Sequence, residues 1–197
     1  MGGGPSYSAS SYNSYRATTK TTNATSASQI YKSSTIHDDL NPKKFAIRES
    51  CDIDGKSATP IILGLDVTGS MDDILLEMAK SGFPKIMEEL FKRKPIEHMN
   101  ILACAVGDVK CDNYPFQATQ FESNVSVIEQ ADKIYFERGG GGNGSESYIL
   151  PWIFALFMVE ADHSNKRNKK GYIFTFGDDG IPSSITPEAV SYTHLRA

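Results

Sequence analysis

The sequence predicts an α/β fold in which helices cover both faces of a mostly parallel, doubly wound sheet. Continuous apolar runs, typical of buried strands, alternate with segments of helical spacing. Each run is followed by a polar or glycine-bearing turn, which places these turns at one edge of the sheet. The clearest predicted strands are 61–65, 99–106 and 172–176.

The beginning of the chain has a different composition from the rest. Residues 1–43 are rich in Ser, Thr, Tyr, Asn and Ala and carry few aliphatic side chains. Such a segment buries too little apolar surface to offset the entropy lost on ordering. We therefore expect a disordered tail over 1–43 and a folded domain over 44–190, which opens on a short edge strand at 45–48.

Helical spacing follows the first buried strand. Apolar residues recur at helical intervals over 71–80, and Gly82-Phe83-Pro84 interrupts the pattern. A second helical segment is predicted over 84–92, since proline is tolerated in a first helical turn. The strand 99–106 comes next, because its run is continuously apolar.

The second half repeats the alternation. A third strand is predicted over 116–121 and a helix over 125–136. The apolar stretch 147–161 lacks a polar face, which predicts a helix buried on most sides. It is too short to cross a bilayer, which needs about 20 residues. The strand 172–176 closes the pattern.

Composition narrows the functional classes. The net charge is -4, with no basic footprint for nucleic acid. Three cysteines without a CxxC pair argue against a disulfide framework and a structural zinc site. The N-terminus has neither the charged nor the apolar region of a secretory signal. We expect a cytoplasmic protein that binds neither nucleic acid nor a membrane.

Oxygen-bearing side chains follow two of the predicted strands. Asp66, Thr68 and Ser70 come directly after strand 61–65, and Asp178 and Asp179 come after strand 172–176. Ligands bind outside the carboxyl ends of parallel strands. Carboxylates with hydroxyls form a hard-oxygen set, which suits Mg²⁺ or Mn²⁺ better than zinc. A third polar segment, the glycine-rich loop 139–147, precedes the apolar helix, whose amino end would direct positive charge toward the site.

Simpler explanations of these residues remain open at this stage. Asp66 would only cap the turn that follows it, and Asp178 or Asp179 would only stabilise a turn, without binding a metal. Ser70 with Asp73 has the spacing of a helix-capping pair. The glycine run has the composition of a flexible linker.

The segment Asp66-Val67-Thr68-Gly69-Ser70 resembles the metal-ion-dependent adhesion motif, Asp-x-Ser/Thr-x-Ser, of von Willebrand factor type A domains. The resemblance covers about residues 44–190. It extends to a group of bacterial and phage proteins that contain such a domain, through Ile47-Arg48-Glu49-Ser50, Gln120-Phe121-Glu122-Ser123 and Gly141-Gly142-Asn143-Gly144-Ser145-Glu146-Ser147-Tyr148.

The resemblance implies a Rossmann-like sheet with Mg²⁺ at its carboxyl edge. Thr68 and Ser70 would be ligands, with Asp66 bound directly or through water. Asn143, with Ser145 close by, occupies the place of a second-loop threonine. Asp178 or Asp179 matches the third-loop aspartate, and Asp178 comes first after the strand. An exchangeable position on the ion would take an acidic side chain from a partner protein. The resemblance therefore implies a protein-binding module rather than an enzyme.

The carboxyl end departs from this family. Such domains continue through further strand–helix units after the third loop, whereas this chain stops soon after Gly180. The last eight residues, 190–197, resemble a translated cloning adaptor. We expect a domain that is incomplete at its C-terminus, with 191–197 a non-native tail.

An enzyme is the alternative. Asp66-x-Thr68-Gly69-Ser70 also resembles the phosphorylated-aspartate motif of haloacid-dehalogenase-like phosphotransferases, with Asp66 as nucleophile and Asp178 on Mg²⁺. In that family a second aspartate, the general acid, stands where this chain has Thr68. A phosphate-clamping lysine does not stand out, although Lys110 and Lys133 are candidates.

Overall fold

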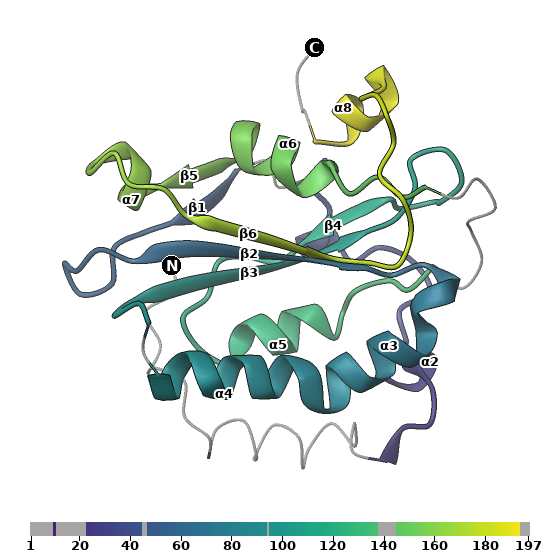
Figure 1. Cartoon of the computed structure of the whole chain (residues 1–197), viewed down its shortest axis with the longest axis horizontal. Helices are drawn as coiled ribbons and strands as arrows, with labels where there is room; N and C mark the ends of the chain where they lie inside the picture. The colour runs from purple at the N-terminus through teal and green to yellow at the C-terminus, as the bar shows by residue number, and fades with distance from the viewer. Residues whose placement is uncertain (1–9, 11–22, 45–46, 94, 138–144, 194–197) are drawn as a thin grey trace.

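The computed structural model describes residue 10 and residues 23–44, 47–93, 95–137 and 145–193. Its centre is a four-stranded sheet in the order β4-β3-β2-β6 (Figure 1). Strands β2 (Thr59–Asp66), β3 (Met99–Val106) and β6 (Tyr172–Phe176) run parallel, and β4 (Phe116–Ala118) pairs antiparallel with β3. The predicted α/β class with a mostly parallel sheet is therefore confirmed.

Helices cover both faces of this sheet (Figure 1). One face carries α3 (Asp72–Glu77), the π-helical η4 (Met78–Gly82), α4 (Phe83–Arg93) and α5 (Ser126–Ala131). The other carries α6 (Leu150–Phe157) and α8 (Pro187–Thr193). Shorter elements are α2 (Ala27–Ile30), η2 (Asp38–Leu40), η3 (Gly69–Met71) and α7 (Asp162–Asn165).

The two faces of β2 and β3 explain their continuous apolar sequence. Every residue of both strands is buried. Ile61, Leu63 and Leu65 point to one core cluster with Met87 of α4. Alternate residues of the strands face a second cluster with Phe154 of α6. A strand covered by helices on both faces has no position at which a polar side chain reaches water.

Several helix boundaries differ from the prediction. The expected interruption at Gly82-Phe83-Pro84 is absent from the described structure, where η4 and α4 follow one another directly. The helix predicted over 125–136 is confined to Ser126–Ala131. Wider turns of the π type absorb a local irregularity in the pattern without ending the helix.

The helix predicted over 147–161 is wrong in its second part. The helix found in this stretch is α6, which ends at Phe157, and the strand β5 (Val159–Ala161) follows it. β5 pairs in parallel with β1 (Arg48–Ser50), and the two strands form a second small sheet. Apolar periodicity alone does not reveal this sheet. α6 also exposes Trp152, Leu156 and Phe157, so it is not buried on most sides.

Within the described ranges, no helix combines the length and the apolar character that a membrane span requires.

The prediction of disorder over 1–43 is wrong for residues 23–43. Ala27, Ile30 and Leu40 are buried, in a cluster with Leu75 of α3 and Phe136. The segment has few apolar residues, but nearly all of them enter this cluster, which composition alone does not predict. The earlier part of the predicted tail, 1–22, lies outside the described residues apart from Ser10.

A buried arginine fastens this segment to the sheet. Arg48 is 0% exposed, and its Nε donates to the carbonyl of Thr119 at 3.0 Å. Its Nη2 donates to the carbonyls of Ala118 (3.1 Å) and Asp39 (2.9 Å). Burial lowers the pKa of Arg48 to about 10, which leaves the guanidinium charged at neutral pH.

Candidate metal centre

The candidate site lies where β2 and β6 end. These strands are parallel neighbours, with Leu65 beside Phe176, so the turns that follow them meet at one edge of the sheet. Asp66 is the last residue of β2 and is fully buried, as is Thr68 after it. Ser70 in η3 and Asp178 after β6 are exposed. The site is therefore closed on the side of the sheet and open toward solvent.

Four side chains form an unbroken series of oxygen contacts. Thr68 Oγ1 donates to Asp66 Oδ1 at 2.7 Å, and the Thr68 backbone N–H donates to the same oxygen at 2.9 Å. Thr68 Oγ1 lies 3.3 Å from Ser70 Oγ. Ser70 Oγ in turn donates to Asp178 Oδ1 at 3.2 Å. The structure thus brings together Asp66, Thr68, Ser70 and Asp178.

This donor set fits a small divalent cation. Magnesium takes oxygen ligands at about 2.0–2.1 Å in an octahedron, which places neighbouring oxygens about 2.9 Å apart. The three side-chain contacts, at 2.7, 3.3 and 3.2 Å, lie around that value. The two longer ones exceed the usual range of O–H···O bonds, about 2.5–3.0 Å. Among the described residues no three His, Cys, Asp or Glu side chains form a metal-holding group, so the hydroxyls would be essential.

Tyr148 connects the three loops, and the sequence did not reveal it. Its hydroxyl donates to Asp66 Oδ2 at 2.5 Å and accepts the backbone N–H of Asp179 at 3.1 Å. Burial and the bond to Asp66 raise the pKa of Tyr148, so the phenol keeps the proton that it donates. A Cβ at Gly177 would collide with the Tyr148 hydroxyl and ring, so a larger residue there would displace Tyr148 from Asp66.

A buried acidic group lies behind the site. Glu146 is 0% exposed, and neither of its carboxylate oxygens has a hydrogen-bond partner in the part of the chain that the structure describes. Burial, then Asp66, Asp112 and further acids, raise the pKa of Glu146 to about 8. Burial likewise raises the pKa of Asp112 to about 6. Negative charge is therefore costly here, and a bound cation would lower that cost.

Glu146 was missed because the prediction considered the glycine-rich loop for its Asn143 and Ser145. Asn143 lies outside the described residues. Ser145 forms a parallel bridge with Gly180, and the backbone N–H of Glu146 donates to the Gly180 carbonyl at 3.0 Å. The end of the second loop therefore adjoins the third. The sequence did offer one signal for Glu146, because this acidic residue directly follows the predicted ligand Ser145.

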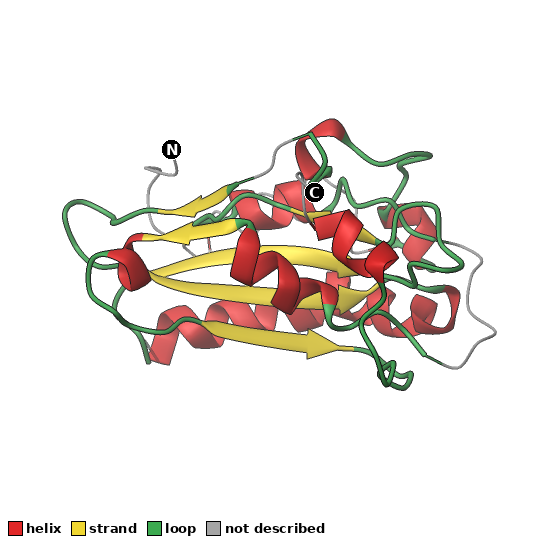
Figure 2. Cartoon of the chain, turned by 90° about the horizontal axis from the view of Figure 1, so that it is seen from above, coloured by secondary structure: helices red, strands yellow, loops and turns green. Residues whose placement is uncertain are grey.

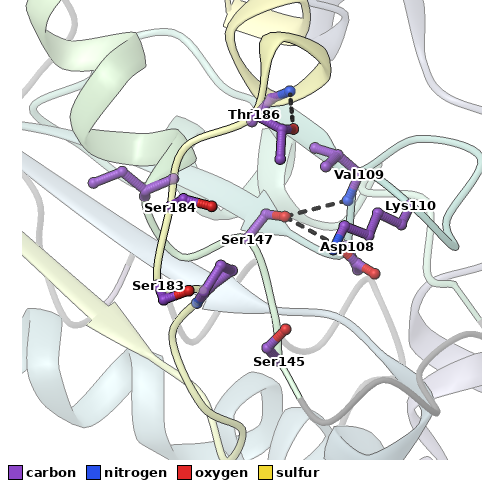
Figure 3. Close-up of a pocket in the computed structure, with 11 residues that line it drawn as sticks. Asp108, Val109, Lys110, Ser145, Ser147, Ser183, Ser184 and Thr186 are labelled. Carbon is purple, nitrogen blue, oxygen red and sulfur yellow. Dashed lines mark hydrogen bonds between the residues drawn. The ribbon is translucent and has the colours of Figure 1, made fainter.

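Beside these loops lies a cavity of about 160 Å³ (Figure 3). Ser147 is one of its lining residues, and its Oγ accepts the Val109 N–H and donates to Asp108 Oδ1, both at 3.3 Å. Its wall is rich in hydroxyls and includes Lys110, Ser145, Ser183 and Thr186. This wall is formed by the described end of the second loop, at Ser145 and Ser147, by the segment after β3 and by the segment before α8.

The simpler explanations have different outcomes. Asp66 does cap its turn, through the Thr68 N–H, and this is compatible with ligation because a carboxylate has about four lone-pair sites. The capping pair Ser70–Asp73 is not found: α3 follows Met71 with no side-chain cap among the described residues. Asp179 uses its backbone N–H in the site, whereas Asp178 uses its carboxylate.

The two lysines considered as phosphate clamps lie in different parts of the structure. Lys133 Nζ is 4.0 Å from Asp39, in the N-terminal segment, and Lys110 lines the cavity of Figure 3.

No protein-family model matches this chain, and neither a curated protein nor a solved structure matches it.

Proposed function

We propose that this chain is a metal-ion-dependent protein-binding module of the von Willebrand factor A type. Asp66, Thr68, Ser70 and Asp178 would hold one Mg²⁺ or Mn²⁺ ion. The observation that carries the proposal is the unbroken series of oxygen contacts among these four side chains, drawn from the ends of two neighbouring strands. The Asp-x-Thr-x-Ser spacing and the mostly parallel sheet support the same assignment.

The exposure of the ligands indicates how a partner would reach the ion. Asp66 and Thr68 are buried, while Ser70 and Asp178 are exposed, so an ion between them would face solvent on one side. When bound, the ion would supply a strong positive charge that attracts an acidic side chain of a partner protein. The Glu146 carboxyl, whose pKa is raised to about 8 by burial and by Asp66 among other acids, would ionise more readily beside a cation and would then help to offset its charge.

The environment of Asp66 supports binding over phosphoryl transfer. Asp66 is 0% exposed, Oδ1 accepts two hydrogen bonds and Oδ2 accepts the Tyr148 hydroxyl. A nucleophilic carboxylate needs an oxygen with an open path to phosphorus. The phosphotransferase alternative would require Tyr148 to move away from Asp66 before any attack.

The test is a titration of the full chain with Mg²⁺ and with Mn²⁺ by calorimetry. Asp178→Asn should weaken binding at least tenfold, because a charged ligand is lost from an exposed position that folding does not need. Asp179→Asn is the matched control and should bind nearly as well as the unmodified chain. Equal heats for the unmodified chain and for Asp178→Asn would contradict the proposal.

A second assay separates the module from the enzyme. The chain is incubated with p-nitrophenyl phosphate and Mg²⁺, with Asp66→Asn as the comparison. We expect no release of nitrophenol from either protein. Turnover that disappears in Asp66→Asn would establish the phosphotransferase instead.

A further inference from the structure

An N-terminal segment packs directly against the loop that carries the proposed ligands. We call residues 66–72 the metal loop and residues 24–40, which include α2 and η2, the strap. Figure 1 shows α2 beside α3, the helix that begins at the end of the metal loop. Figure 2 views the sheet from the side of α6, so the helical layer that contains α3 lies behind the strands. α2 therefore lies on the face away from α8, the last described helix.

The apolar residues of the metal loop are buried together with the strap. Val67 and Met71 stand next to proposed ligands in the chain, and each is 3% exposed. They share one buried cluster with Ala24, Ala27 and Ile30 of the strap. Because packed apolar side chains tolerate few alternative arrangements, this cluster favours a single conformation of the loop.

A hydrogen bond also joins the strap to the metal loop. The Ala27 N–H donates to Asp72 Oδ1 at 3.2 Å. Ala27 is fully buried and is the first residue of α2, so its N–H has no partner within its own helix. Asp72 directly follows η3, the turn that contains Ser70. The strap is therefore tied to the turn that positions one of the proposed ligands.

The rest of the strap is attached in a way that lets α2 separate without unfolding the sheet. Its far end is fastened by Arg48, which donates to the carbonyl of Asp39. Between that point and α2, the Ser33 hydroxyl donates to the Lys133 carbonyl at 3.0 Å in an exposed position. A segment with few buried side chains and exposed hydrogen bonds opens locally at a lower free-energy cost than the core.

We propose that docking of the strap and binding of the cation strengthen each other. This inference rests on the proposed function and assigns a means of regulation to the same site. The docked strap holds the metal loop in the arrangement that binds the ion, and a factor that detaches the strap lowers the affinity for the ion. The coupling is reciprocal, so the bound ion stabilises the docked strap by the same factor.

Ala27→Glu tests the effect of the strap on the ion. It places a carboxylate at a fully buried position beside Asp72, which should detach α2. The matched control Gln29→Glu adds the same charge at an exposed position of α2. In calorimetric titration, Ala27→Glu should bind Mg²⁺ about tenfold more weakly than the control, a typical size for coupling between sites. An added carboxylate would by itself attract the cation, so a loss of affinity reports the displaced loop.

Hydrogen exchange of the α2 amides tests the reciprocal effect without disturbing the buried cluster. In the unmodified chain, saturating Mg²⁺ should slow this exchange about tenfold relative to EDTA. A pair of variants measures the tie to the loop: Asp72→Ala and Asp72→Asn remove the same charge, but only asparagine keeps an acceptor for the Ala27 N–H. In EDTA, exchange should be about fivefold faster in Asp72→Ala than in Asp72→Asn, the size expected for one hydrogen bond.

The outcomes separate this inference from the proposed function. Equal Mg²⁺ affinities for Ala27→Glu and Gln29→Glu, with α2 exchange unchanged by Mg²⁺, would overturn the coupling and leave the metal site in place. Absence of Mg²⁺ binding by the unmodified chain would overturn the metal site and the coupling together. Equal exchange in the two Asp72 variants would show that the hydrogen bond does not hold the strap.

Discussion

Tyr148→Phe is the sharpest test of how the site is held together. The change removes one oxygen atom and keeps the buried ring. That oxygen donates to Asp66 Oδ2 at 2.5 Å and accepts the Asp179 N–H at 3.1 Å. Tyr148 is 7% exposed and Asp66 is 0% exposed, so water does not readily replace the lost hydroxyl. The variant therefore leaves a buried carboxylate oxygen without its donor.

The expected loss of stability follows from these two bonds. A hydrogen bond to a charged group contributes about 1.5–3 kcal/mol, and a bond to a backbone N–H about 1 kcal/mol. Tyr148→Phe should therefore reduce the free energy of unfolding by about 2.5–4 kcal/mol. A second effect is expected on cation binding, since Asp66 loses the group that orients it. Loss of such a supporting contact typically weakens metal affinity by about 10–100-fold.

Urea unfolding in EDTA measures the first effect, and calorimetric titration with Mg²⁺ measures the second. Tyr31→Phe is the control, because Tyr31 is also buried and stacks near Phe136, outside the site. A loss of less than about 0.5 kcal/mol in Tyr148→Phe, or a loss equal to that of the control, would refute the assigned role of the hydroxyl.

The strands were the most predictable part of the fold. The bounds predicted for 99–106 and 172–176 are those of β3 and β6, because an apolar run flanked by polar residues marks a buried strand at both ends. The pairing of Val159–Ala161 with Arg48–Ser50 was not predictable from periodicity. Three-residue strands are too short to show a period, and their partner lies far away in the sequence.

The candidate site was predictable where one short motif supplies the residues. Asp66, Thr68 and Ser70 lie together because the turn after β2 is local. Their approach to Asp178 required that β6 neighbour β2, which strand–helix alternation permits but does not specify. The roles of Tyr148 and Glu146 depend on contacts with Asp66, Asp179 and Gly180, which are far away in the sequence, and no local pattern encodes those contacts. Ligation itself remains a prediction.

Two further substitutions test the structure away from the site. Arg48→Met should destabilise the fold by about 3 kcal/mol, since the carbonyls of Asp39, Ala118 and Thr119 lose their donor; urea unfolding measures this, and an unchanged midpoint would contradict it. Asp132→Asn tests a pH dependence. Burial raises the pKa of Asp132 from 3.8 to about 7, so between these values the folded chain binds a proton that the unfolded chain releases. Stability should therefore fall as pH rises from about 4 to 7. The full shift corresponds to about 4 kcal/mol, and partial exposure reduces this to roughly 2 kcal/mol. The asparagine variant lacks this titration, so its stability relative to the unmodified chain should rise across the same window. Parallel pH profiles of urea unfolding for the two proteins would show that the Asp132 carboxyl titrates as it does in water.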